Sequence, residues 1–174
     1  MKLRLAAALV GGVVLGATTA QAAPVSANAN ANATIVAPNQ LTATRDLDFG
    51  SIAKPTVGAT TVTVASAASA SATPSVSGGN GFVPTPGQAR AATFHLVGTS
   101  GQTYSITANN LSFAGADGEL SNVGAETPVA ASGTLNTLPA DGQDDLYVGG
   151  HFDITSETDT QVYTGTLSLT VDFN

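Results

Sequence analysis

The sequence contains no cysteine and no tryptophan, and charged residues make up only 10% of its 174 residues. Without cysteine the protein has no thiol nucleophile, no disulfide bond and no cysteine-ligated metal centre. Five residues are lysine or arginine, against twelve that are aspartate or glutamate. Because phosphate binding depends on a basic surface, this balance argues against nucleic acid as a partner.

Segments with a helical period are also missing after the first 22 residues. The chain is poor in strong helix formers and rich in Thr, Ser, Gly, Ala and Val, and apolar residues recur at every second position in short runs. Such alternation is typical of strands with one buried face. We therefore predict an all-β protein, a β-sandwich of about seven to nine strands.

The first 22 residues have the pattern of a secretory signal peptide. Lys2 and Arg4 precede an apolar run from Leu5 to Gly16, and Ala20-Gln21-Ala22 supplies the small residues that cleavage needs. The run is too short to span a bilayer comfortably, so we expect no membrane span in the mature chain. Removal of Lys2 and Arg4 leaves three basic and twelve acidic residues, a formal charge of −9.

We expect this chain to be exported. Its expected parts are a signal peptide over residues 1–22, a flexible N-terminal extension over 23–33 and a sandwich domain over 34–174.

The stretch from Gln161 to Asn174 has the longest strand pattern in the chain. Hydroxyl and polar residues fill one face, and the other face holds Tyr163, Leu167, Leu169, Val171 and Phe173. Burying each of these side chains is worth about 1.5–3 kcal/mol. We expect the chain's own body to leave this face half covered, at a cost on the order of 5 kcal/mol. Its cover is then expected to come from earlier in the chain or from another molecule.

The N-terminal extension is an uncharged segment with small residues at a period of two. Asparagine alternates with alanine up to Ala33, and Ile35 continues the alanine face; the residues of this face, which we call the donor segment, are Ala27, Ala29, Ala31, Ala33 and Ile35. One interpretation is a disordered leader, because the segment has little apolar area to bury. The other is a strand that lies in a partner's groove.

Other strands are expected along the body. The pattern predicts strands at Leu41–Ile52, Thr60–Val64 and Leu146–Ile154, and a hairpin formed by Arg90–Val97 and Gln102–Thr107. The small, polar stretch from Ala65 to Gln88 is expected to be a surface loop.

No set of residues in the sequence forms a catalytic constellation. The stretch Gly98-Thr99-Ser100 begins like a nucleophile elbow, but Gln102 stands where the pattern requires glycine. His95 and His151 each lie on the polar face of a predicted strand, which favours a solvated strand residue over a general base. We therefore expect no enzymatic activity and no cofactor.

Asp141, Asp144 and Asp145 form the densest acidic group in the chain. Calcium prefers several oxygen ligands, but the spacing of these residues matches no calcium-loop signature. Acidic turns are common on exported acidic proteins, so the sequence leaves calcium binding open.

Three stretches carry a resemblance to a known family. They are DLDFGSI at Asp46–Ile52, LYVGGHF at Leu146–Phe152 and YTGTLSLTVDF at Tyr163–Phe173. Together they resemble a family of exported bacterial β-domains of unassigned function. That family is similar to the spore-coat-U-like subunits of archaic chaperone–usher pili. The resemblance covers most of residues 33–174.

The resemblance implies an immunoglobulin-like pilin fold that lacks its final strand. It implies a periplasmic chaperone along the C-terminal strand, an outer-membrane usher, and polymerisation by donor-strand exchange. In that scheme Phe173 occupies the next-to-last position, where such pilins often have an aromatic residue, and Ala27 to Ile35 supply the donor. The function we expect is therefore a structural subunit of a surface pilus. The alternative is an exported monomeric β-sandwich that binds a carbohydrate or a cation.

Overall fold

The computed structural model describes residues 25–36, 38–68, 71–113 and 120–174. Within these ranges the protein contains strands and no helix. The all-β class predicted from the alternating pattern is therefore confirmed for this part of the chain. The signal peptide expected at residues 1–22 lies outside the described residues.

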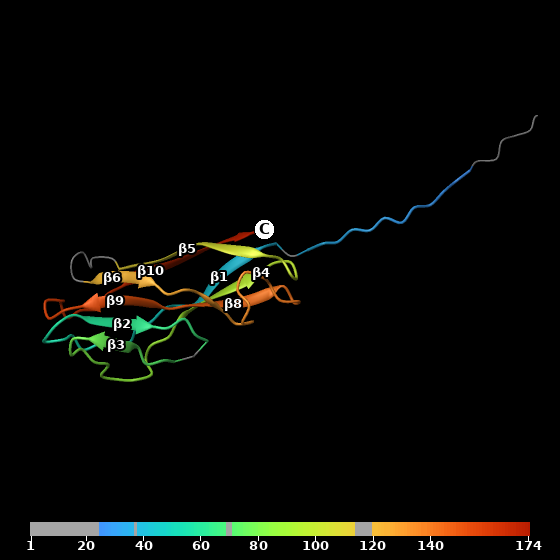
Figure 1. The fold of residues 1–174 in the computed structure, drawn as a ribbon. Helices are drawn as coiled ribbons and strands as arrows, with labels where there is room; N and C mark the ends of the chain where they lie inside the picture. The colour runs from blue at the N-terminus through green and yellow to red at the C-terminus, as the bar shows by residue number, and fades with distance from the viewer. Residues whose placement is uncertain (1–24, 37, 69–70, 114–119) are drawn as a thin grey trace, which may run out of the picture. The chain divides into compact units, whose positions relative to one another are not determined.

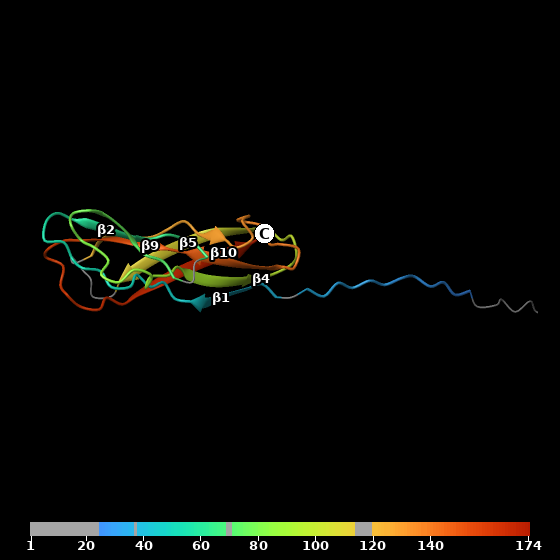
Figure 2. The same cartoon turned by 90° about the horizontal axis from the view of Figure 1, so that it is seen from below.

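In this described part of the chain, ten strands form three antiparallel sheets (Figure 1). The strands are β1 (Gln40–Arg45), β2 (Thr60–Val64), β3 (Ser75–Gly78), β4 (Ala92–Val97), β5 (Tyr104–Phe113), β6 (Ser121–Ala125), β7 (Val129–Ala130), β8 (Gln143–Val148), β9 (Gly150–Ile154) and β10 (Gly165–Phe173). One sheet has the order β1-β4-β8-β7, the second has the order β3-β2-β9-β6, and β10 pairs with β5 in the third. This arrangement is a β-sandwich, seen from a second direction in Figure 2.

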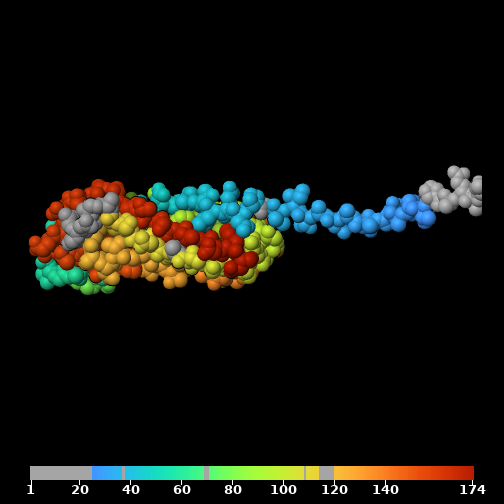
Figure 3. Space-filling view, turned by 90° about the horizontal axis from the view of Figure 1, so that it is seen from above, coloured from blue at the N-terminus to red at the C-terminus, as the bar shows by residue number. Residues whose placement is uncertain are grey.

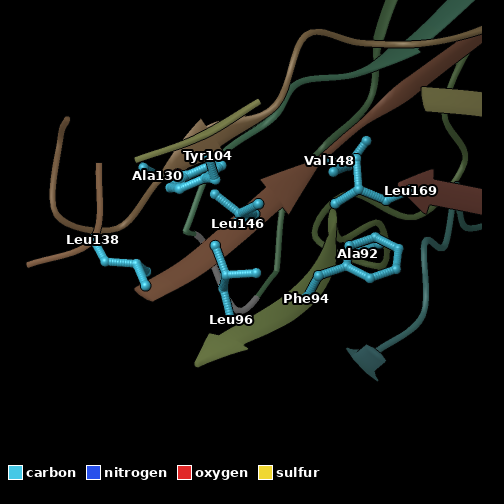
Figure 4. Packing of buried hydrophobic residues seen from close by; sticks show 9 residues of the cluster. All are labelled: Ala92, Phe94, Leu96, Tyr104, Ala130, Leu138, Leu146, Val148 and Leu169. Atoms are coloured by element: carbon cyan, nitrogen blue, oxygen red, sulfur yellow. The ribbon is translucent and has the colours of Figure 1, made fainter. Parts of the chain in front are cut away.

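Two apolar clusters stabilise the sandwich. The larger cluster gathers side chains from β4, β5, β8 and β10, and Figure 4 shows its nine buried members, Ala92, Phe94, Leu96, Tyr104, Ala130, Leu138, Leu146, Val148 and Leu169. The smaller one consists of Val62, Leu120, Phe152 and Ile154, with Phe49 and Phe113 packed against it. The alternate apolar residues of β2, β8 and β9 are buried, because the two-residue period places them on the core face. They are Val62, Val64, Leu146, Val148, Phe152 and Ile154.

The stretch Leu146–Ile154, which we expected to be one strand, is divided between two sheets. β8 pairs with β4 and β7, whereas β9 pairs with β2 and β6. Gly149 lies at the crossing, where a Cβ atom would overlap the main-chain carbonyl of Val64. Only glycine allows this close approach of two backbones, so the Gly-Gly pair marks the point at which the chain changes sheets.

The hairpin expected from Arg90–Val97 and Gln102–Thr107 does not form. β4 pairs with β1 on one side and with β8 on the other, and β5 pairs with β10. Because both edges of β4 are taken by strands distant in sequence, the turn at residues 98–101 carries the chain into another sheet. The expected loop Ala65–Gln88 also differs, since it contributes β3 and a bridge between Ala72 and Ala89.

Candidate functional site: an unpaired strand edge beside an apolar groove

β10 is paired on one edge. Its register against β5 places Leu167 opposite Leu111, Leu169 opposite Asn109 and Phe173 opposite Tyr104. The register shifts once, between Thr170 and Val171. Among the described residues no strand pairs with the other edge of β10. The main-chain groups on that edge are therefore available to an added strand.

The apolar face of β10 is partly covered by the chain's own body. Leu169 is 9% exposed, and the partly buried side chains of Leu167, Val171 and Phe173 pack against the larger core cluster. Tyr163 precedes the strand and packs against the smaller cluster. The chain's own body therefore buries one of these side chains and covers the others in part. The open feature of this strand is its hydrogen-bonding edge.

Other sheet edges are shorter or irregular. β7 has two residues and β3 has four, while β1 and β6 each contain a register shift. Short or bulged edges resist pairing with another chain. The second side of β5 is met by Asn136, which accepts from the Tyr104 amide, and by Glu126, which accepts from the Asn109 side chain. β10, with nine residues, is the longest edge strand in the described chain apart from β5, and its own register shifts once.

A groove of about 720 Å³ lies beside the segment that leads into β10 and the first residues of that strand. One wall, which we call the N-wall, comprises Ala43 and residues 45–54, and the other, the C-wall, comprises residues 158–165 and Leu167. Figure 3 shows the two segments on one face of the molecule, β10 in red and the residues after β1 in cyan. The floor is apolar and consists of Ala92, Phe94, Leu111, Phe113, Leu120, Phe152 and Ile154.

Three phenylalanine rings form the centre of this groove. The Phe49 ring lies 4.8 Å from that of Phe152 and 6.1 Å from that of Phe113, and the latter two are 5.6 Å apart. Edge-on and tilted contacts at these distances are favourable for aromatic pairs. The Leu-x-Phe-Gly element at residues 47–50 therefore places a large aromatic side chain in the N-wall.

Local contacts fix the shape of the N-wall. Asp48 forms main-chain hydrogen bonds with Arg90 in both directions, at 2.9 and 2.8 Å, and its side chain forms a 3.5 Å ion pair with the same residue. Gly50 has a φ of 69°, a value that most residues adopt only with strain. β1 ends at Arg45, earlier than the strand to Ile52 that the sequence predicts, and the irregular backbone beyond it opens the groove.

The donor segment has no regular secondary structure in the described residues. Residues 25–36 are all exposed, and the fractional exposure is 100% for Val25 and 95% for Ile35. Ala27, Ala29, Ala31 and Ala33 are likewise exposed. The large apolar side chains of Val25 and Ile35 thus lie at the two ends of a run of small residues.

The histidines and acidic residues are engaged in local pairs. His95 Nδ1 lies 2.8 Å from Asp145 Oδ1, and His151 Nδ1 lies 2.7 Å from Glu126 Oε1. Asp141 accepts from the Gln143 amide, 3.2 Å away. No group of three or more His, Asp or Glu in the described ranges is arranged to hold a metal ion.

The described ranges contain no helix that is long and apolar enough to cross a membrane.

The comparison with protein families places the whole sandwich in one family. A model described as a domain of unknown function, DUF4402, matches residues 39–173, from the residue before β1 to the end of β10. No curated protein and no solved structure matches the chain. The protein therefore belongs to the DUF4402 family, an unassigned family of β-domains.

Proposed function

We propose that this protein is a structural subunit of a surface pilus, assembled by donor-strand exchange between copies. In this proposal the donor segment of one copy enters the groove of the next and pairs with the free edge of β10. The observation that carries the proposal is the unpaired edge of β10 beside a groove with an apolar floor.

The chemistry of the groove suits an added strand. A strand supplies a row of N–H and C=O groups to the open edge and sends every second side chain toward the floor. Each hydrogen bond gained contributes about 0.5–1.5 kcal/mol net, and burial of the floor adds about 25 cal/mol per Å². An occupant of the groove would therefore stabilise the subunit as well as join it to a neighbour.

The donor segment matches these demands in charge and period. It carries no charged residue, whereas the mature chain carries a net charge of −9. An uncharged strand can approach this acidic body without repulsion, and its two-residue period places one face toward the floor. Because a donor cannot fill its own copy's groove and the next one at once, the contact is head-to-tail and propagates as a fibre.

The remaining steps belong to the same proposal. A signal peptide at residues 1–22 exports the chain, a periplasmic chaperone covers the β10 edge before assembly, and an outer-membrane usher delivers the fibre to the cell surface. Without such cover an open edge would pair indiscriminately.

The test is to express the full chain and a variant lacking residues 23–33 beside a chaperone and usher. We expect the full chain to give fibres by electron microscopy and SDS-resistant ladders, and the deletion variant to stay folded but unassembled. Ladders that persist after the deletion would overturn the assignment of the donor. A full chain that stays monomeric under these conditions would overturn the function.

A further inference from the structure

One contact joins the two walls of the groove across its end. Lys54 lies on the N-wall, and its ammonium Nζ donates to the carbonyl oxygens of Ser156 and Thr158, at 3.1 and 2.9 Å. These partners are 102 and 104 residues further along the chain and belong to the loop that leads into the C-wall. Hydrogen bonds from a charged donor are stronger than those between neutral groups.

Both ends of this contact are anchored. Pro55, the next residue after Lys54, is fully buried, and Ala53 exchanges two main-chain hydrogen bonds with Phe82. On the other side Thr158 is 4% exposed, and its hydroxyl oxygen accepts from the Thr155 amide at 3.0 Å. The Lys54 side chain therefore links two parts of the body that are each fixed by their own contacts.

The opposite end of the groove has a different arrangement. β1 is held by β4 and β10 is held by β5, and no strand pairing joins β1 to β10 in the described chain. The two walls are thus connected by the hydrogen bonds of Lys54, whereas β1 and β10 are not paired with each other. The distance between the walls at Lys54 therefore limits the width that is available to an inserted strand.

We propose that Lys54 is a positioning residue for the groove: its two hydrogen bonds hold the N-wall and C-wall at the spacing that an inserted strand requires. This inference rests on the proposed function, because it concerns the same groove. Lys54 acts here through the walls and contributes no side chain to the floor. Loss of the ammonium removes this link between the walls, so their spacing varies more and an inserted strand dissociates sooner.

The absence of cysteine allows the wall spacing to be measured directly. Ser51 on the N-wall and Val162 on the C-wall are exposed, and Val162 is 89% exposed. We would introduce Ser51→Cys and Val162→Cys into the mature chain, attach spin labels and record distances on unassembled protein. We expect Lys54→Met to lengthen and broaden the distance distribution, and Lys54→Arg to keep that of the unsubstituted chain.

Arg90→Met is the matched control. It removes the same charge, but the Arg90 side chain only forms an exposed 3.5 Å ion pair with Asp48, which contributes little to stability, and the main-chain hydrogen bonds that hold the N-wall at Asp48 remain. We expect this control to leave the distance unchanged. On unlabelled protein we expect multimers of Lys54→Met to dissociate about tenfold faster than those of Arg90→Met, at similar melting temperatures of the unassembled chains.

The outcomes separate this inference from the function on which it rests. Unchanged distances in Lys54→Met would overturn the positioning role, whether or not the chain assembles. Longer distances with unchanged dissociation of multimers would overturn it as well. If the unsubstituted chain forms no multimers, the proposed function fails, and the inserted-strand role of Lys54 fails with it.

Discussion

The hydroxyl group of Ser132 donates a 2.6 Å hydrogen bond to Oδ2 of Asp144, a residue that is only 6% exposed. Oδ1 of the same carboxylate accepts from the amides of Ser132, at 3.1 Å, and Asp145, at 2.8 Å. This carboxylate thus fastens the loop after β7 to the start of β8. Both carboxylate oxygens of Asp144 thus accept hydrogen bonds from protein groups. Asp144 belongs to the acidic group for which the sequence alone left calcium binding open.

Replacement of Asp144 by alanine should lower the free energy of unfolding by about 2 kcal/mol, because hydrogen bonds to charged groups contribute about 1.5–3 kcal/mol. Asp141→Ala is the control, since Asp141 is exposed and surface changes usually stay within about 0.5 kcal/mol. Chemical denaturation monitored by circular dichroism measures both values. Equal losses in the two variants would contradict the structural role of Asp144.

Truncation of Leu169 tests whether the inward face of β10 belongs to the core. Leu169→Ala should cost about 2–5 kcal/mol, because the side chain is nearly buried in the larger cluster. Thr170→Ala, on the exposed face of the same strand, should change stability by less than about 0.5 kcal/mol. A small loss in Leu169→Ala during denaturant unfolding would mean that the face is uncovered after all.

The buried phenol of Tyr104 predicts a loss of stability in alkaline solution. Desolvation by burial raises the pKa of Tyr104 above its ordinary value of 10.0, and the negative charge of Asp144 acts in the same direction. The folded state therefore keeps the proton at a pH at which the unfolded state has lost it. The stabilisation is complete below pH 10.0 and falls as the pH rises toward the folded-state pKa.

Tyr104→Phe removes the titrating group and should flatten this decline. The measurement is the free energy of unfolding of both proteins from pH 8 to 11, a window of about one to two units around the tyrosine pKa. Parallel declines in the two proteins would assign the alkaline sensitivity to other groups.

Two neighbouring substitutions test which face of the donor segment enters the groove. Ala31→Asp places a carboxylate on the alanine face, whereas Asn30→Asp places the same charge on the opposite face. If the alanine face enters the groove, Ala31→Asp should abolish SDS-resistant ladders, because an unpaired charge would be buried there. Asn30→Asp should retain them. Equal behaviour of the two variants would show that the segment does not dock as a strand.

Alternation in the sequence predicted the regular strands well. The pattern Thr60–Val64 matches β2 at both ends, and its alternate residues Val62 and Val64 are buried. The inward residues of β10 from Leu167 onward also follow the predicted period. This success has a simple cause, since a two-residue period acts through neighbours in the chain and needs no knowledge of the partner strand.

Pairing between distant strands could not be predicted in the same way. The turn between β4 and β5 has the residues of a hairpin, yet β1 and β8 take both edges of β4. The residues that line the groove could not be predicted either, because Phe94, Phe113 and Phe152 come from three separate strands. The contact between Lys54 and the carbonyl oxygens of Ser156 and Thr158 has no signal in the sequence at all.

The sheet change at Gly149 has a mechanical consequence. β8 and β9 are joined by a single residue, so the two four-stranded layers are covalently tied at their middle. A force that pulls one sheet away is therefore transmitted to the other sheet through this one-residue connection. A subunit built in this way should resist stretching as a single body and rupture in one force peak.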